Sequence, residues 1–213
     1  MLSAPGTAGT ALVCTGNQHK VEELRTLLPE WTLLPLPAGT ELPPETGETL
    51  VDNARIKAHG GKHLAPQGAW VIADDSGLCV DALDGAPGVK SARFAGEDAQ
   101  DADNTALLLT SLASVDAPRR GAHFACVLVA ISPSGDEVIA SGKVMGTIAA
   151  APRGTGGFGY DPVFIPEGFD QTFAELGQDI KDSMSHRSRA AAALAMQLPV
   201  YSSAAAADTS VLP

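Results

Sequence analysis

A short apolar run that ends at two adjacent acids constrains this chain more than any other feature. The segment reads Val71-Ile72-Ala73-Asp74-Asp75-Ser76-Gly77-Leu78. The run from Ala69 to Ala73 predicts a buried strand, and Ser76-Gly77 predicts a turn that reverses the backbone. We therefore expect both carboxylates where a central strand leaves a sheet, which is the usual place for sites in α/β folds.

Two neighbouring carboxylates in such a cleft repel each other and attract a divalent cation, so they indicate phosphate chemistry. The alternative is a solvated Asp-Asp-Ser-Gly turn, because Asp, Ser and Gly are common turn residues. The segment alone does not decide between a site and a turn, and the surrounding motifs carry the decision.

Helix-like and strand-like segments alternate early in the chain, and a hairpin with a Pro-Ser-Gly-Asp turn follows later. Strands are predicted at 11–15, 31–36, 69–73, 78–83, 123–131 and 137–148, and helices at 18–28, 48–64, 101–114 and 185–198. This order predicts an α/β fold with a mixed sheet and helices on both sides. We expect a flexible N-terminus over 1–9, a single domain over 10–200 and a disordered, Ala-rich tail over 201–213.

Composition excludes several classes of function. A net charge of −11 argues against a nucleic-acid polymer as partner. No apolar stretch reaches the ~18 residues needed to span a bilayer, and the N-terminus lacks the pattern of a secretory signal, so we expect a cytoplasmic protein. The three cysteines lie in apolar runs without metal-ligand spacing, which favours buried thiols in a reducing compartment.

The segment Thr15-Gly16-Asn17-Gln18-His19-Lys20 follows a predicted strand and opens a predicted helix. Unsatisfied amides and the macrodipole make a helix N-terminus an anion site, and Lys20 adds a full positive charge. The pattern is not a P-loop, because GxxxxGK[ST] is absent. The alternative is an Asn-capped helix with an exposed lysine.

The run Gly154-Thr155-Gly156-Gly157-Phe158-Gly159 formally matches GxGxxG. A dinucleotide-binding turn requires a helix next, whereas Pro162 forces the residue before it out of helical conformation. The glycines more readily let the backbone pass close to a ligand, with the Phe158 ring available to stack on a base. The alternative for Phe158 is ordinary core packing. Further on, Lys181 and His186-Arg187 would by themselves be a solvated charged loop.

In their order, the blocks 15–24, 45–58, 73–96, 154–168, 172–176 and 181–187 resemble the inosine triphosphate pyrophosphatase family, from about Thr10 to Leu198. The resemblance implies an elongated, two-lobed fold with the site in a central cleft, and a homodimer. It implies Mg²⁺-dependent hydrolysis of ITP, dITP and XTP to the monophosphate and pyrophosphate. With only 14 Lys and Arg, the cations that serve a triphosphate must gather in one cleft.

The resemblance also assigns roles to residues. Asp75 falls on the position of general base and metal ligand, and sequence does not separate the two roles. Substrate-binding positions fall on Thr15, Gly16, Asn17, Gln18, His19, Lys20, Ser76, Phe158, Gly159, Tyr160, Asp161, Lys181, His186 and Arg187. His186 and Arg187 are expected near the purine, because a 6-oxo purine offers acceptors that suit an arginine.

One departure from the family's pattern concerns the metal. Many relatives carry two acids before Thr-Gly, whereas this chain has Pro44-Glu45. Pro44 has no ligating group, so Glu45 is the candidate second metal ligand. Lys57 matches a basic position of the family or is an exposed helix residue, and Arg93 could be structural. Two alternatives stay open: a related pyrophosphatase with another nucleotide preference, and a nucleotide-binding module without catalysis.

Overall fold

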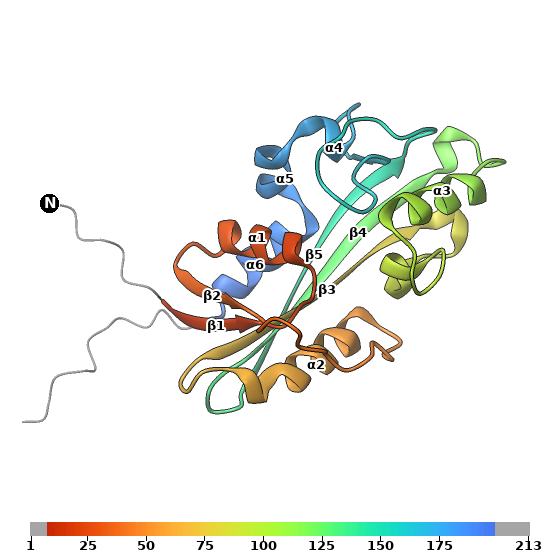
Figure 1. The fold of residues 1–213 in the computed structure, drawn as a ribbon. Coiled ribbons are helices and arrows are strands. Elements are labelled where there is room, and N and C mark those ends of the chain that lie inside the picture. Colours follow the sequence, from red (N-terminus) through yellow and green to blue (C-terminus); the bar gives the residue numbers. More distant parts are fainter. Residues whose placement is uncertain (1–7, 199–213) are drawn as a thin grey trace, which may run out of the picture.

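The computed structural model describes residues 8–198 (Figure 1). The expected tail over 201–213 lies outside the described residues, as does most of the expected flexible N-terminus. Within that N-terminal stretch, Ala8 is buried and Gly9 already begins the first strand, so the ordered fold starts before residue 10. No helix among the described residues has the length and apolar character needed to cross a bilayer.

Six strands form one mixed sheet in the order β2-β1-β3-β4-β5-β6. They are β1 (Gly9–Val13), β2 (Trp31–Pro35), β3 (Trp70–Val80), β4 (Gly121–Ile131), β5 (Glu137–Ile148) and β6 (Phe164–Pro166). β1 runs parallel to β2 and β3, and the remaining pairs are antiparallel. The expected α/β fold with a mixed sheet is confirmed.

Helices cover the sheet on both faces. They are α1 (Gln18–Leu27), α2 (Leu50–Gly61), α3 (Asp101–Ser111), α4 (Phe173–Leu176), α5 (Gln178–Met184) and α6 (His186–Ala195), with short 3₁₀ turns η1 (Lys62–Leu64), η2 (Asp81–Leu83), η3 (Gly88–Arg93) and η4 (Ala117–Arg119). Leu24 of α1 and Leu194 of α6 share one core cluster with Ile72, while Ala58 of α2 packs with Val71 on the opposite face. α1 and α6 therefore cover one face and α2 the other (Figure 1).

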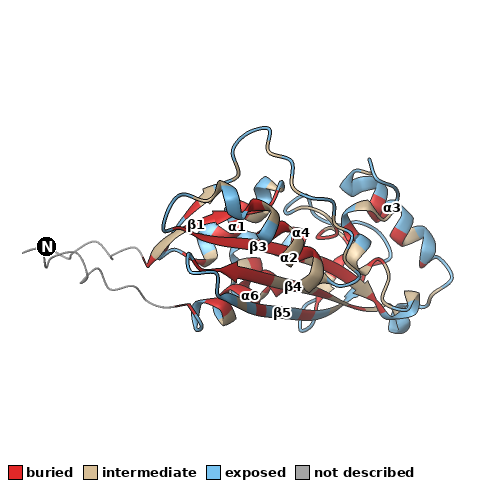
Figure 2. Cartoon of the chain, turned by 90° about the horizontal axis from the view of Figure 1, so that it is seen from below, coloured by how far each residue is buried: buried red, intermediate tan, exposed pale blue. Residues whose placement is uncertain are grey.

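A second lobe forms at the far end of the long strands. Leu78 of β3, Phe124 of β4 and Val144 of β5 build a separate core cluster there with Leu108 of α3 and Phe173 of α4. β3, β4 and β5 run through both lobes, and buried residues follow them along their length (Figure 2). The elongated, two-lobed architecture rests on these three strands.

The turn expected at Ser76-Gly77 does not exist, and β3 runs straight through it. β4 pairs with β3 without interruption from Val71 to Val80, and ten ladder positions outweigh the local turn preference of Ser-Gly. Gly77 serves close packing instead, because a Cβ at this position would lie 2.3 Å from the carbonyl oxygen of Gly88. The strand predicted at 78–83 is consequently the end of β3 followed by η2.

One further prediction is corrected near the C-terminus. Lys181 lies in α5 and not in a loop, whereas His186 and Arg187 are the first two residues of α6, within the helix predicted at 185–198. Ser185 caps α6 by accepting a hydrogen bond from the backbone of Ser188 at 3.1 Å. These side chains are therefore held by helix geometry, which gives them fixed directions.

Candidate active site

Asp74 and Asp75 are neighbours in the chain but face opposite sides of the sheet. Successive side chains of a strand alternate between its faces. Asp74 lies on the side of α1 and α6, where it contacts Lys20 and Arg187, and Asp75 lies on the side of α2, where it contacts Lys57. The pair therefore does not form one acidic centre, and the expected mutual repulsion is replaced by pairing with cations.

The pair also lies inside β3 and not at its end. β1 stops at Val13, which pairs with Ile72, so β3 loses its neighbour on that edge just before the two acids. The opening beside them thus comes from the early end of β1 and the start of α1.

Asp74 is fully buried and is held by three donors. Arg187 Nε donates to Asp74 Oδ2 at 3.0 Å, the thiol of Cys126 donates to the same oxygen at 3.1 Å, and Lys20 forms an ion pair with Oδ1. Burial alone would raise the pKa of Asp74, but Arg187 and Lys20 outweigh it and hold the pKa well below its usual range. Asp74 is therefore an ionised anchor for two cations.

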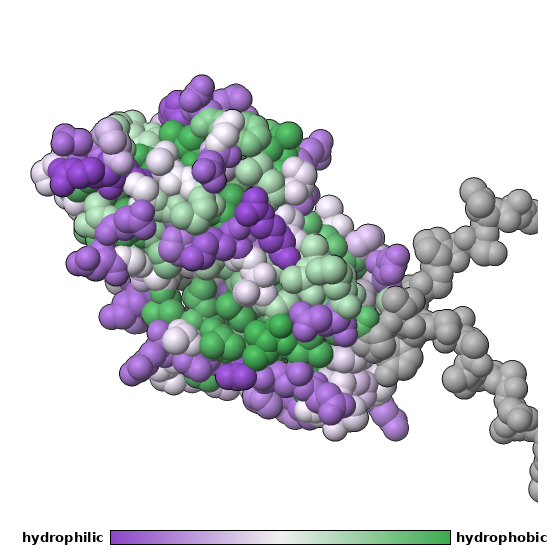
Figure 3. Space-filling model, turned by 180° about the vertical axis from the view of Figure 1, so that it is seen from behind, coloured by the Kyte–Doolittle hydropathy of each residue, from purple (hydrophilic) through white to green (hydrophobic). Residues whose placement is uncertain are grey.

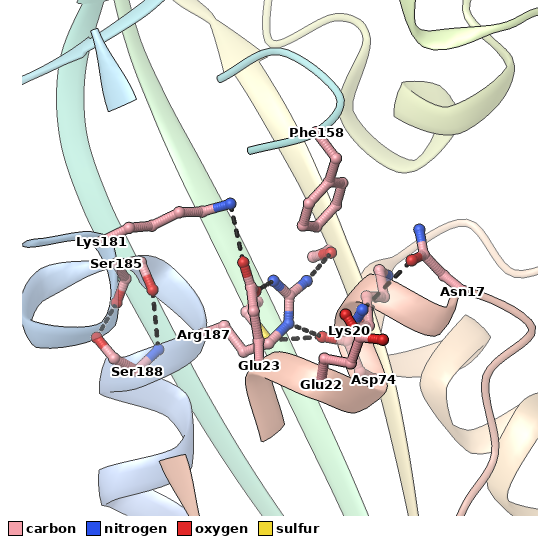
Figure 4. A network of polar contacts seen from close by, with 12 residues as sticks. Asn17, Lys20, Glu22, Glu23, Asp74, Phe158, Lys181, Ser185, Arg187 and Ser188 are labelled. Carbon is pink, nitrogen blue, oxygen red and sulfur yellow. Dashed lines mark hydrogen bonds and ion pairs between the residues drawn. The ribbon is translucent and has the colours of Figure 1, made fainter. Parts of the chain in front are cut away.

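The network continues from Arg187 through Glu23 to Lys181 (Figure 4). Glu23 accepts from Arg187 and forms an ion pair with Lys181 at 2.9 Å, and Lys181 also contacts Asp161 at 2.5 Å. Glu23 and its partners are all less than one tenth exposed. Anions and cations alternate through this chain, so each buried charge is compensated.

Glu23 was not among the site residues predicted from the sequence. The signal for it is helical spacing, because Glu23 follows Lys20 by three residues and precedes Leu27 by four on α1. An acid placed among the inward-facing positions of an amphipathic helix requires a buried cation as partner. Helical spacing therefore predicts Glu23 as a partner of a buried cation.

On the other face of the sheet, Lys57 joins two carboxylates. Its Nζ lies 2.7 Å from Asp75 Oδ1 and 2.7 Å from Glu45 Oε1, and Arg93 Nη1 donates to Glu45 Oε2 at 3.1 Å. Burial raises the pKa of Asp75 although Lys57 opposes the shift. For Glu45, burial acts in the same direction, but Lys57 outweighs it and the pKa is lowered. Asp75 Oδ2 is buried and has no hydrogen-bond partner.

A cavity opens between the two lobes on the α1 and α6 side. Ten of its lining residues were predicted from the sequence, namely Asn17, Lys20, Ser76, Phe158, Gly159, Tyr160, Asp161, Lys181, His186 and Arg187, and the others are Gly77, Ser91, Ala92, Asp101 and Phe124. His186 stacks on Phe124 with ring centroids 4.7 Å apart, and burial lowers the pKa of His186, so its ring is neutral. One wall is thus flat and apolar.

Phe158 also lines this cavity. Its ring stacks on His19 with centroids 5.3 Å apart, and Lys181 Nζ lies 4.3 Å from its centroid. The ring is half-buried and packs against charged and polar groups, so it does not belong to either lobe's apolar core. Ordinary core packing does not describe this residue.

The remaining predicted residues lie near the cavity without lining it. Thr15 is buried and Gly16, Gln18 and His19 are exposed at the start of α1. Asn17 Oδ1 accepts from the backbone of Lys20 at 3.3 Å, so Asn17 caps α1 as the alternative interpretation required. Lys20 is nevertheless mostly buried through its ion pair with Asp74, which excludes the exposed lysine of that interpretation.

The residues present fit a metal ion only in part. Among residues 8–198, no group of three or more His, Cys, Asp or Glu side chains is arranged to hold one. Asp75 and Glu45 nevertheless share Lys57, and Asp75 Oδ2 is without a partner. Mg²⁺ commonly takes one or two carboxylates and completes its shell with water and substrate phosphates, and this donor set suits that mode of binding.

Known proteins resemble this chain over most of its length. The model of the Ham1 family matches residues 11–197. A dITP/XTP pyrophosphatase of Mycobacterium tuberculosis is 49% identical over 201 residues, which cover 91% of this chain and 96% of that protein. A dITP/XTP pyrophosphatase of Opitutus terrae is 45% identical over 86% of this chain and 95% of its own. The structure of the Staphylococcus aureus Ham1 protein superposes with a TM-score of 0.77 and 36% identity, over 89% and 97% of the two chains.

Proposed function

The chain belongs to the Ham1 family, and on that premise we propose that it hydrolyses dITP, ITP and XTP to the nucleoside monophosphate and pyrophosphate. Such an enzyme removes deaminated purines from the nucleotide pool. The observation that carries the proposal is the position of Asp75. It lies on the α2 side of β3, next to Ser76 of the cavity wall, at the edge of β3 that β1 leaves open after Ile72, and it holds a buried carboxylate oxygen with no partner.

Asp75 is suited to act as general base. Its pKa is raised by burial, and a carboxylate with a raised pKa accepts a proton more readily from an attacking water. Lys57 holds the other oxygen at 2.7 Å, which fixes the direction in which Oδ2 points. We assign to Asp75 the removal of a proton from the water that attacks the α-phosphorus.

Mg²⁺ would be held by Asp75 and Glu45 together with the phosphates of the substrate. When bound, it neutralises the negative charge of the triphosphate. Pro44 offers no ligand, and Glu45 is instead fixed toward Asp75 by Lys57 and Arg93. The chain thereby keeps a second carboxylate at this site despite its departure from the family's pattern.

The nucleobase would lie in the cavity between the two lobes. Arg187 uses Nε for Asp74, Nη1 for Glu23 and Nη2 for Ser76, which leaves two of its five N–H donors free. These two donors match the acceptors O6 and N7 of a 6-oxo purine. Adenine keeps the N7 acceptor but presents an amino group at position 6, so it would leave one buried donor unpaired, which can discriminate by about 10⁴.

The triphosphate is assigned to the start of α1. The first turn of a helix attracts anions, and Lys20 lines the cavity at this end. We propose that Thr15, Gly16, Gln18 and His19 contribute to this end of the site. When the substrate binds, Lys20 and Lys181 give up part of their contact with carboxylates and contact the phosphates instead.

The direct test is pyrophosphate release from dITP and from dATP, with and without Mg²⁺. We expect turnover of dITP that requires the metal ion and exceeds turnover of dATP by at least about 100-fold. Equal low rates on both nucleotides would exclude the proposal. A panel of pyrimidine and modified triphosphates tests the alternative preference, and tight binding of dITP without turnover would identify a non-catalytic nucleotide-binding module.

We further propose that the protein is a cytoplasmic homodimer without membrane or nucleic-acid partners. All three cysteines are free thiols, in agreement with a reducing compartment. The face behind the view of Figure 1 carries a band of hydrophobic residues bordered by hydrophilic ones (Figure 3), and such bands are common at protein interfaces. Size-exclusion chromatography with light scattering tests the dimer, and a monomeric mass would refute it.

A further inference from the structure

The segment 157–159, which carries Phe158, lies between three hollows. It borders the main cavity on one side, a hollow beside α1 on another and a hollow beside α3 on a third. Gly157 and Gly159 have φ of +73° and +62°, a region that side chains disfavour. A segment with open space around it needs hydrogen bonds to keep one conformation.

α3 supplies those hydrogen bonds at Gly159. The backbone N–H of Gly159 donates to Asp101 Oδ2 at 2.7 Å, and its carbonyl oxygen accepts from Thr105 Oγ1 at 3.4 Å. Asp101 and Thr105 are four residues apart and therefore share one face of the helix. Both polar groups of one glycine are thus held by the first turns of α3.

The other end of the segment is tied to the buried charge network. The N–H of Phe158 donates to Asp161 Oδ2 at 2.9 Å, and the same oxygen contacts Lys181. The hydroxyl of Tyr160 donates to the carbonyl of Ser91 at 2.8 Å. These contacts fix the base of the segment, whereas Asp101 fixes its tip.

We propose that Asp101, assisted by Thr105, is a positioning residue for the nucleobase. By clamping Gly159 it sets the place of Phe158 in the cavity that His186 also lines, and so the shape of the space that a purine enters. This inference rests on the proposed function. It assigns a substrate-binding task to α3, none of whose residues was among the site residues predicted from the sequence.

Removing the clamp should weaken base binding without changing the chemistry. In Asp101→Ala we expect KM for dITP to rise about 3- to 10-fold, the range of one hydrogen bond to a charged acceptor at an exposed position. We expect kcat to stay within twofold, because the segment does not approach Asp75. Tripolyphosphate, which has no base, should inhibit the variant and the wild type with equal Ki.

Two variants separate the clamp from other effects. Asp101→Asn keeps an acceptor for the Gly159 amide and should retain most of the affinity. Asp103→Ala removes the same charge from the same turn and breaks the cap of α3, where Asp103 accepts from the backbone of Gln100 at 2.9 Å, but it touches no residue of the 157–159 segment. It should lower the melting temperature and leave KM for dITP unchanged.

The experiment is steady-state kinetics on wild type and the three variants, with thermal melts and calorimetric titration of dIMP. The inference is overturned by a KM for Asp101→Ala within twofold of wild type, by an equal rise in Asp103→Ala, or by an equal loss of tripolyphosphate binding. Failure of the wild type to turn over dITP would refute the proposed function alone. In that case, the dIMP affinities of the same variants still test whether Asp101 positions the segment that carries Phe158.

Discussion

Asp74 and Asp75 carry the same functional group in adjacent positions, and their surroundings give them opposite properties. Three donors surround Asp74, and two of them, Arg187 and Lys20, lower its pKa, whereas Asp75 keeps one unpaired oxygen and burial raises its pKa. A strand alternates its side chains between two faces, so one residue of sequence separates two environments. Asp74 holds two cations in place, and Asp75 keeps one oxygen without a partner, as the proposed role requires.

This difference predicts opposite effects on stability. Asp74→Asn removes the negative charge that compensates Arg187 and Lys20. It should lower the free energy of unfolding by about 3 kcal/mol, as for other broken buried pairs. For a chain of this size, that lowers the melting temperature at pH 7 by about 6–12 °C. The lowered pKa of Asp74 means that its contribution is present above the unfolded value and is lost as pH falls through the folded value.

Asp75→Asn is the matched control, with the same change in the next residue of β3. A raised pKa means that the contribution of Asp75 to stability is present below its ordinary value of 3.8 and is lost as pH rises through the folded value. At pH 7 the variant should therefore melt no lower than wild type, and Lys57 keeps Glu45 as partner. Equal melting temperatures for the two variants would contradict the assignment.

Asp75→Asn should also lower the rate of pyrophosphate release at least about 100-fold, which is the usual contribution of a general base. In the wild type, the rate should fall toward acid pH as Asp75 takes up a proton, with an apparent pKa above the ordinary 3.8. A pH series of initial rates with dITP measures this. A rate for the variant within tenfold of wild type would refute the role of Asp75.

Elements place these side chains through backbone contacts as well as through their own packing. α6 begins with His186 and Arg187 and lies directly on β5. A Cβ at Gly142 would lie 2.2 Å from the carbonyl oxygen of His186 and 2.4 Å from the amide nitrogen of Ala190. The absence of a side chain at this one position therefore sets the distance between helix and sheet.

Gly142→Ala should push α6 away from the sheet at the cavity. We expect a loss of about 1–3 kcal/mol in the free energy of unfolding, as for other overpacked sites, together with a raised KM for dITP because Arg187 moves with the helix. Chemical denaturation and steady-state kinetics measure the two effects. Ser141→Ala, at the exposed neighbouring position of β5, should change neither, and a similar effect there would point to strand propensity instead.

Over the whole molecule, an acidic chain collects its cations at one place. Of 14 Lys and Arg residues, five lie at the two faces of the site: Lys20, Lys57, Arg93, Lys181 and Arg187. Each is paired with a carboxylate, so the site itself is close to neutral. A triphosphate needs a metal ion there to balance its charge.

Binding of a nucleotide and its phosphates should therefore stabilise the fold only when Mg²⁺ is also present. Intact dITP is unsuited as the ligand because the wild type would hydrolyse it, and an inactive Asp75 variant is unsuited because it loses the proposed metal ligand. The test therefore uses wild type with the products dIMP and pyrophosphate, with and without Mg²⁺. At 100 times the dissociation constant the stabilisation is about 2.7 kcal/mol, or roughly 5–11 °C in melting temperature. Thermal melts that rise equally without Mg²⁺ would contradict a role for the metal ion.

Sequence reasoning worked where the signal was local and periodic. It placed α1 within one residue and the hairpin of β4 and β5 almost in full. It failed at Ser76-Gly77, where pairing with a distant strand overrides the turn preference. Lys181 and Arg187 were selected by resemblance, but their shared partner Glu23 lies more than 150 residues away in the chain, a distance that no local pattern reveals.

The sequence by itself determined the alternation of elements, the acid pair, the Asn-capped start of α1 with Lys20 and the membership of the family, because these depend on residue types in short windows. Tertiary structure decided which face each acid occupies, which carboxylate holds each buried cation, and how α3 grips Gly159. Those outcomes depend on strand register and helix placement, and both are fixed by burial and hydrogen bonding between segments that only the folded chain brings together.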